Sequence, residues 1–142
     1  MGKTVLFAGL AFMLSGISSA LEAEESAQMK MIVEDQTFEV VLEQNETAAS
    51  FLKMLPLTVE MADLNANEKY RYLDKALPSA PEYVGQIASG DVMLFGNDCL
   101  VIFYKSFQTS YPYTKIGRIA GLPDLKSLSE PNTVRVVFSG GE

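Results

Sequence analysis

The chain has 142 residues, a formal net charge of −7, no histidine and one cysteine, and these features exclude several classes of function. Without histidine, Ser-His-Asp and Cys-His catalysis cannot operate within the chain, and the commonest zinc ligand is missing. An acidic chain without a basic cluster is poorly suited to nucleic acid, because binding it requires neutralisation of phosphates. Cys99 can form no intramolecular disulfide, and its apolar neighbours favour a buried, inert thiol over a reactive one.

The N-terminus has the pattern of a signal peptide. Lys3 precedes an apolar run over residues 4–14, and small residues stand at Ser18 and Ala20. The run is shorter than the roughly 20 residues of a membrane-spanning helix. We therefore expect a periplasmic or secreted protein, cleaved near Ala20, with no stable membrane anchor after cleavage. The alternative is an uncleaved first helix.

These boundaries divide the chain into three parts. Residues 1–20 are the predicted signal peptide, and the acidic residues 21–28 are a predicted disordered leader. Residues 29–142 have a length that suits one domain with one core.

The domain begins with two short β-prone runs, residues 29–33 and 37–42, whose polar connection predicts a hairpin. Asn45 then has the character of a helix N-cap. Residues 46–55 place apolar side chains at helical spacing, and Pro56 ends the predicted helix.

Short extended segments follow. Residues 57–64 alternate between apolar and polar side chains and predict a half-buried strand. Residues 68–73 predict another extended piece with two tyrosines on one side. Residues 92–95 and 99–104 flank Gly-Asn-Asp, which predicts a second hairpin.

The C-terminal third begins with residues 105–115, which are polar and aromatic and are interpreted as a long loop. We then expect a short strand at 116–120, a short helix at 123–128 and a closing strand at 133–138. Many short strands with two short helices predict a mostly-β domain, a closed or nearly closed barrel. Periodicity predicts a core that contains Val40, Phe51, Leu52, Leu94, Val101, Phe103, Val136 and Phe138.

Two stretches resemble the start of the cyclophilins. Phe38–Leu42 reads FEVVL and Thr47–Leu52 reads TAASFL, where cyclophilins have a strand like F-E-L followed by a helix like T-A-E-N-F. The order of hairpin, helix, strands, late helix and final strand is also similar. Residues 90–96, 100–104 and 116–119 look like bacterial cyclophilin-like families of small barrels. The resemblance implies a small closed cyclophilin-like β-barrel with one helix after the first hairpin and a short late helix.

The chain departs from the cyclophilin isomerases at the motif that carries catalysis. Those enzymes have a block like F-H-R-x-x-P-G-F-x-x-Q-G-G-D after the helix, and its arginine polarises the prolyl amide. Here the region reads KYRYLDK over residues 69–75, and Arg71 lies at a comparable distance from the helix. The histidine, Pro-Gly-Phe and Gln-Gly-Gly are missing around it. The resemblance therefore assigns no catalytic residue.

The candidate binding residues are aromatic and cationic. An arginine beside tyrosines can stack on and hydrogen-bond a peptide carbonyl or carboxylate, and aromatic residues on a loop can form the lip of a cleft. Each also has a structural interpretation, as a surface arginine or as a tyrosine that closes a barrel end. The candidates are Arg71, Tyr72, Tyr111, Tyr113 and Arg118.

No cofactor and no metal site is expected, because Asp91, Asp98 and Asp124 form no run of ligands and the first two lie in turns. The sequence favours a non-catalytic module that binds a peptide or a small molecule. We expect it not to bind nucleic acid. The alternatives are a peptidyl-prolyl isomerase with a divergent site and a structural or interaction protein.

Overall fold

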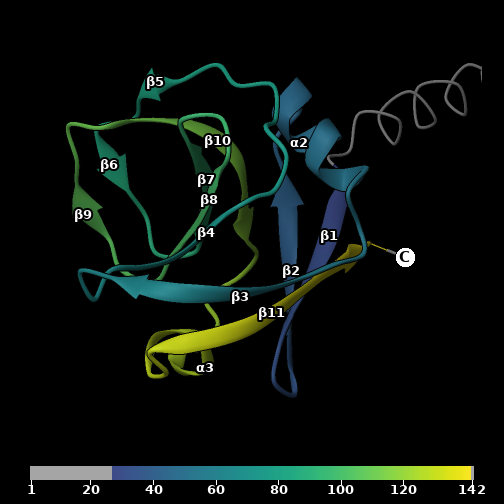
Figure 1. Ribbon diagram of the computed structural model, residues 1–142. Coiled ribbons are helices and arrows are strands. Elements are labelled where there is room, and N and C mark those ends of the chain that lie inside the picture. Colours follow the sequence, from purple (N-terminus) through teal and green to yellow (C-terminus); the bar gives the residue numbers. More distant parts are fainter. Residues whose placement is uncertain (1–26, 142) are drawn as a thin grey trace, which may run out of the picture.

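A computed structural model describes residues 27–141, which form a closed antiparallel β-barrel with two short helices (Figure 1). The strands of the barrel wall, in order around it, are β2 (Gln36–Leu42), β1 (Gln28–Val33), β11 (Thr133–Gly140), β3 (Leu57–Leu64), β4 (Glu68–Tyr72), β8 (Cys99–Phe103), β7 (Asp91–Phe95) and β10 (Pro112–Ile119). The helices are α2 (Glu46–Leu52) and α3 (Lys126–Ser129). Three short strands lie outside the wall: β5 (Glu82–Tyr83), β6 (Gln86–Ile87) and β9 (Phe107–Gln108).

The predicted signal peptide and residues 21–26 of the predicted leader lie outside the described residues. Gln28, which was assigned to the leader, is the first residue of β1. The mostly-β class, the closed barrel, the helix after the first hairpin and the short late helix predicted from the sequence are confirmed, although both helices are shorter than predicted.

The barrel closes where β10 pairs with β2, and this seam depends on a glycine. Gly117 lies opposite Leu42, next to a register shift in the pairing of β10 with β7. A Cβ atom at Gly117 would lie 2.5 Å from the carbonyl oxygen of Val41, closer than real Cβ atoms approach. The absence of a side chain therefore lets the two strands meet.

The barrel interior follows the two-residue period of its strands. Met29, Met31 and Val33 of β1 are fully buried, as are Val136 and Phe138 of β11. Helix α2 lies over one end of the barrel (Figure 1). The ring of its Phe51 packs edge-to-face against Phe138, with 5.2 Å between ring centroids.

Asn45 caps α2 and ties the helix to the wall. Its side-chain oxygen accepts a hydrogen bond from the backbone N–H of Ala48, and its amide nitrogen donates to the carbonyl of Lys115 on β10, each over 2.8 Å. The predicted N-cap is confirmed. The helix ends at Leu52 and not at Leu55, because Met54 and Leu55 make tighter bonds that span three residues.

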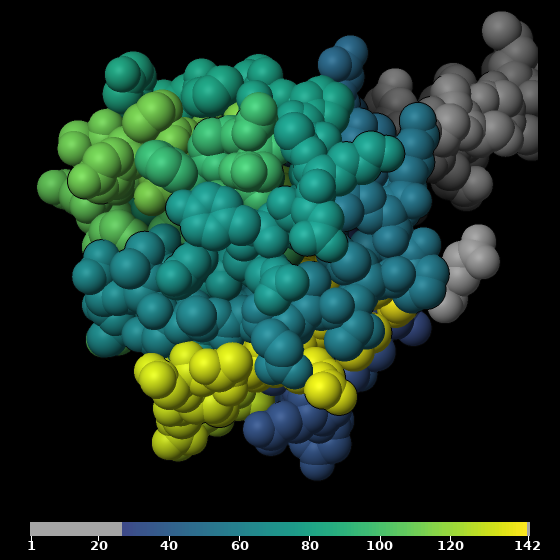
Figure 2. All heavy atoms as spheres, viewed as in Figure 1, coloured from purple at the N-terminus to yellow at the C-terminus, as the bar shows by residue number. Residues whose placement is uncertain are grey.

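The opposite end of the barrel holds α3 and the turn between β1 and β2, which adjoin at the surface (Figure 2). Ser127 donates a hydrogen bond to Gln36 over 2.7 Å, and the Gln36 amide donates to the carbonyl of Asp124 over 3.0 Å. The prediction that this helix begins at Pro123 was wrong. The Asp124 carboxylate accepts a hydrogen bond from the Lys126 N–H, so the chain turns before the helix starts.

The interpretation of residues 105–115 as a loop was wrong for about half of its length. Residues 107–108 form β9, and β10 begins at Pro112. These polar and aromatic residues lack a clear two-residue pattern, and their strand partners lie earlier in the chain: Tyr113 pairs with Glu82 of β5 and Thr114 with Leu94 of β7.

The predicted core residues are buried with one exception, although two of them lie outside the barrel. Leu52 is only partly buried against the interior core. Val101 and Phe103 are buried on the outer face of β8, in a second apolar cluster. The others are in the barrel interior: Val40, Phe51, Leu94, Val136 and Phe138.

We expect Phe51→Ala to lower the free energy of unfolding by about 3–5 kcal/mol, because Phe51 is fully buried and its loss leaves a cavity under α2. Chemical denaturation monitored by circular dichroism would measure the change. Leu122→Ala is the control, since Leu122 is fully exposed and its removal should change stability by less than ~0.5 kcal/mol. Equal midpoints for Phe51→Ala and the wild type would show that α2 does not pack as described.

Candidate ligand-binding site

Strand β8 is buried on both of its faces. Leu100 and Ile102 point into the barrel, and Cys99, Val101 and Phe103 point outward. The outward side is covered by β6 and β9, which pair with each other on that side of the barrel (Figure 1). Ile87 of β6 is fully buried and Phe107 of β9 is partly buried against this outer cluster. The cover and the wall together form a second, smaller core outside the barrel.

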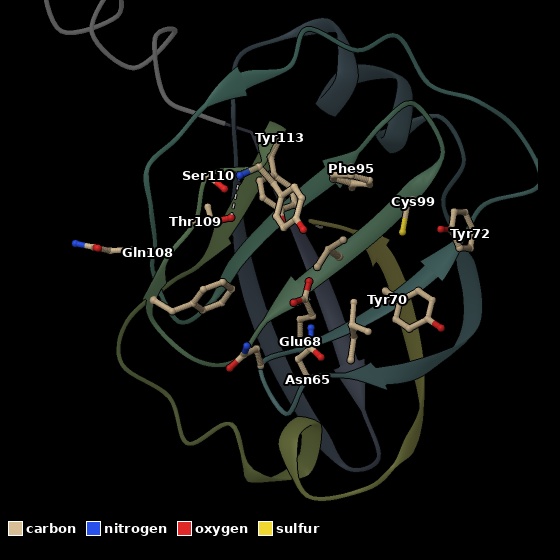
Figure 3. Close-up of a pocket in the computed structure, with 15 residues that line it drawn as sticks. Asn65, Glu68, Tyr70, Tyr72, Phe95, Cys99, Gln108, Thr109, Ser110 and Tyr113 are labelled. Carbon is tan, nitrogen blue, oxygen red and sulfur yellow. Dashed lines mark hydrogen bonds between the residues drawn. The ribbon is translucent and has the colours of Figure 1, made fainter.

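Between the cover and strand β4 lies a cavity of about 590 Å³ (Figure 3). Its lining comes from the β3–β4 turn, from β4, from the β7–β8 hairpin and from residues 107–113. Six aromatic side chains take part in this lining: Tyr70, Tyr72, Phe95, Phe107, Tyr111 and Tyr113.

The aromatic rings hold one another in edge-to-face or tilted contacts. Tyr70 and Tyr72 are two residues apart on β4, and their ring centroids are 6.1 Å apart. Phe95 contacts Tyr111 at 6.1 Å and Tyr113 at 5.6 Å. These contacts fix the rings before any ligand enters, which reduces the entropy lost on binding.

Glu68, the first residue of β4, contributes the one carboxyl group of the lining. It is only 7% exposed, and Figure 3 shows its carboxyl pointing into the space between Tyr70 and Tyr113. Within residues 27–141 its side chain forms neither a salt bridge nor a hydrogen bond. Since no fully buried polar side-chain atom of these residues lacks a partner, the carboxyl oxygens of Glu68 keep contact with the solvent of the cavity. Burial, with a smaller contribution from the negative charge of Asp63, raises the pKa of Glu68 to about 7.

The neighbouring Lys69 does not neutralise Glu68. Lys69 is fully buried, and its ammonium group lies 2.7 Å from Oδ1 of Asp63. The same carboxylate oxygen accepts a hydrogen bond from the Tyr104 hydroxyl over 2.5 Å. The hydrogen bond from Lys69, followed by that from Tyr104, lowers the pKa of Asp63. The ammonium group of Lys69 is therefore paired on one side of β4, while the carboxyl group of Glu68 is unpaired on the other side.

Three of the five predicted binding residues line the cavity: Tyr72, Tyr111 and Tyr113. Arg71 is exposed, lies between the two β4 tyrosines in sequence, and has its Nη1 atom 3.5 Å from the carbonyl oxygen of Glu60. Arg118 is exposed on β10 opposite Asp91. The structure thus brings the tyrosines together and leaves both arginines out of the lining.

Glu68 was not among the predicted site residues and was interpreted only as the first residue of the short extended piece over residues 68–73. The signal that could have found it is the two-residue period of β4, which places Glu68 on the same face as Tyr70 and Tyr72. Its burial could not be predicted, because the residues that cover it are about 40 positions later in the chain.

Cys99 also lines the cavity, and the residue is 5% exposed. Burial, followed by the charges of Asp98 and Glu68, raises its pKa to about 11. The thiol therefore stays protonated at neutral pH and is a poor nucleophile, as its apolar neighbours predicted.

A second hollow of about 490 Å³ lies beside the N-terminus of α2. Its rim carries Glu43, Glu46 and Glu82, and Lys115 lies 3.5 Å from the Glu82 carboxylate. In the part of the chain that the structure describes, no three potential metal ligands cluster together, and no helix has the length and apolar character to cross a bilayer.

A family model described as the cyclophilin-like family matches residues 31–139. The chain belongs to the cyclophilin-like family. A search of curated proteins gave no match.

A solved structure of another protein has a similar fold. The solution structure of a hypothetical protein from Archaeoglobus fulgidus is similar with a TM-score of 0.57 and 17% identity, over 82% of this chain and 95% of that one. At this identity the likeness concerns the fold alone. The predicted resemblance is confirmed at the level of family and fold.

The pKa of Glu68 has a consequence for stability. A folded-state pKa of about 7, above the ordinary value of 4.5, means that the folded protein binds this proton more tightly than the unfolded chain does. Stability should therefore fall as the pH rises from 4.5 to 7. Glu68→Gln removes this effect, so the variant should be more stable than the wild type by about 1–3 kcal/mol at pH 8 and similar to it at pH 4.

Denaturation at several pH values would measure the difference. Glu39→Gln is the matched control, because Glu39 is an exposed carboxylate on β2 and its removal changes the net charge equally. A Glu68→Gln curve parallel to that of the wild type across this pH range would contradict the description of Glu68.

Proposed function

We propose that this cyclophilin-like domain is a non-catalytic binding module that takes a small molecule or a short peptide segment into the cavity beside β4. The observation that carries the proposal is the preformed cavity of about 590 Å³ with aromatic walls and one buried, unpaired carboxyl group. Ligand sites of proteins are typically clefts of ~300–1,000 Å³ with apolar walls and a few placed polar groups.

Two tyrosines favour ligand contact at the mouth of the cavity. Tyr72 is 60% exposed and Tyr111 is 62% exposed, so both rings present apolar surface and a hydroxyl to an arriving ligand. Deeper in, Val101 and Tyr113 are buried and belong to the outer core. A ligand would therefore gain apolar contact without displacing packed side chains.

The same geometry argues against prolyl isomerisation. Lowering a rotation barrier of ~18–20 kcal/mol requires a donor fixed against the prolyl nitrogen. Arg71 is the arginine at a comparable distance from the helix, but the cyclophilin motif is missing around it, and its Nη1 atom lies 3.5 Å from the carbonyl oxygen of Glu60, which is not part of the lining. We expect no acceleration in a proline-peptide exchange assay. Acceleration that disappears in Arg71→Ala would replace the binding proposal with a divergent isomerase.

The ligand-binding proposal predicts that the mouth tyrosines matter more than other exposed tyrosines. A set of small organic fragments and short peptides, screened by ¹H–¹⁵N NMR, should shift backbone signals of the cavity lining. Tyr72→Ala and Tyr111→Ala should each weaken the binding of a hit by about five- to tenfold, through loss of aromatic contact. Both positions are exposed, so the variants should stay folded.

Tyr83→Ala is the control, since Tyr83 is 80% exposed on β5 and is not part of the lining. A set of hits that leaves the lining signals unchanged, or equal weakening by Tyr83→Ala, would contradict the proposal. Binding of a partner protein elsewhere on the barrel, without any ligand in the cavity, would then favour a structural or interaction role.

The site of action is part of the proposal. Lys3, the apolar residues 4–14 and the small residues before position 21 support export to the periplasm or the medium. The expected mature protein begins near Leu21, and intact-mass measurement on the exported protein would detect this. A full-length mass would contradict both the cleavage and the compartment.

A further inference from the structure

Glu68 and the aromatic rings around it suggest which class of ligand the cavity prefers. We propose that the cavity selects organic monocations, binding an ammonium group at the Glu68 carboxylate and an apolar stem against the tyrosine and phenylalanine rings. This inference rests on the proposed binding function and specifies the chemistry of its ligand.

The first argument is the charge of the lining. Glu68 is more than nine-tenths buried, points into the cavity and forms no ion pair within the described residues. The remaining polar side chains of the lining are neutral amides and hydroxyls: Asn65, Asn67, Gln108, Thr109 and Ser110. A buried carboxylate without a partner is costly, and an ammonium group with three N–H donors would supply that partner.

The second argument is the aromatic wall. The faces of aromatic rings carry partial negative charge and attract cations within about 6 Å of the ring centroid. Tyr70 and Tyr72 lie along β4 from Glu68, while Phe95 and Tyr113 lie on the other side of the cavity (Figure 3). A cation seated at Glu68 therefore finds rings on either side, whereas an anion would be repelled by the carboxylate.

The third argument is that Lys69, the cationic residue next to Glu68, already has Asp63 as its ion-pair partner. The Lys69 ammonium is held between the Asp63 carboxylate at 2.7 Å and the ring of Tyr104, whose centroid is 5.3 Å away. It therefore does not serve as the internal partner of Glu68. The net charge of −7 also favours the approach of a cation from solution.

Three matched probes test the inference: benzylammonium, its neutral analogue benzyl alcohol, and the anion benzoate. Each would be titrated into ¹⁵N-labelled protein at pH 8, with the signals of the cavity lining followed by NMR. Benzylammonium should bind at least about tenfold more tightly than benzyl alcohol, because a partly buried charge pair adds to the shared aromatic contact. Benzoate should bind more weakly than either.

Two variants isolate the carboxylate. Glu68→Gln should remove the preference for benzylammonium over benzyl alcohol while keeping the shape of the cavity. Glu39→Gln changes the net charge by the same amount at an exposed site of β2 and should keep the preference. Preservation of the preference in Glu68→Gln would overturn the inference.

The outcomes separate this inference from the function on which it rests. Equal binding of benzylammonium and benzyl alcohol to the lining would overturn the preference for cations and would support a neutral ligand in the same cavity. Failure of all three probes to shift any signal of the lining would overturn the cation site. The broader fragment and peptide screen then decides the binding function independently.

The pH dependence gives a second readout. Benzylammonium should bind severalfold more tightly at pH 8 than at pH 6, since the carboxyl of Glu68 loses its proton in this interval. Burial raises the pKa of Cys99, Tyr104 and Tyr113, so these groups stay protonated and neutral in this interval, and the hydrogen bond from Lys69 lowers the pKa of Asp63, which stays ionised. The other ionisable side chains beside the cavity are Tyr70, Tyr72 and Tyr111. Equal affinity at both pH values would contradict the role of Glu68.

Discussion

Strand β8 is buried on both faces, and this burial determines how the outer cover and the cavity are arranged. Leu100 and Ile102 complete the barrel interior, while Val101 and Phe103 need a second apolar partner outside the barrel. The chain supplies that partner with β6, β9 and the start of β10, which lie over the outer face. Because the cover does not reach across all of β4, a cavity remains beside that strand. The candidate site is thus a consequence of how the outer face of one strand is covered.

Strand β4 carries two adjacent buried ionisable residues, Lys69 with an ion-pair partner and Glu68 without one among the described residues. Lys69 is fully buried with Asp63 as its ion-pair partner, and Tyr104 adds a hydrogen bond to the same oxygen. Glu68 is buried without any such partner in the described chain, at a cost in stability that a glutamine would avoid. Proteins tolerate such costs most often at sites of function, where a ligand completes the missing interaction. This contrast is the physical basis of the cation preference that we propose.

Much of the fold could be predicted from the sequence, because local patterns dominate there. The first hairpin, the Asn45 cap, the strand over residues 57–64 and the Gly-Asn-Asp hairpin all depend on neighbours within a few residues. Closure of the barrel was predicted from the many short strands, because closure removes the exposed edges of a small sheet, and the family resemblance agreed with it. Tyr72 was predicted as a candidate because it neighbours Arg71, and Tyr111 and Tyr113 because aromatic residues on a predicted loop can form the lip of a cleft.

The remaining features depend on contacts between distant parts of the chain. Residues 107–113 were interpreted as loop because β9 and the start of β10 find their partners about 20 to 30 positions earlier. Arg71 was grouped with Tyr72 although adjacent residues of a strand face opposite ways, which the two-residue period alone could have corrected. The same period places Glu68 on the face of Tyr70 and Tyr72, but its burial could not be predicted, because a glutamate at a strand start is ordinarily exposed and only the tertiary cover buries it.

Measuring the pKa of Glu68 in the free protein would test whether its carboxyl is largely buried and unpaired. Selective ¹³C labelling of glutamate side chains, with Glu68→Gln to identify the signal, would give its titration by NMR. We expect a midpoint at about 7, well above those of exposed glutamates, because Glu68 is largely buried beside aromatic rings and its carboxyl has no partner among the described residues. A midpoint near the ordinary value of 4.5 would show that the carboxyl is solvated or paired, and would contradict the proposed cation site.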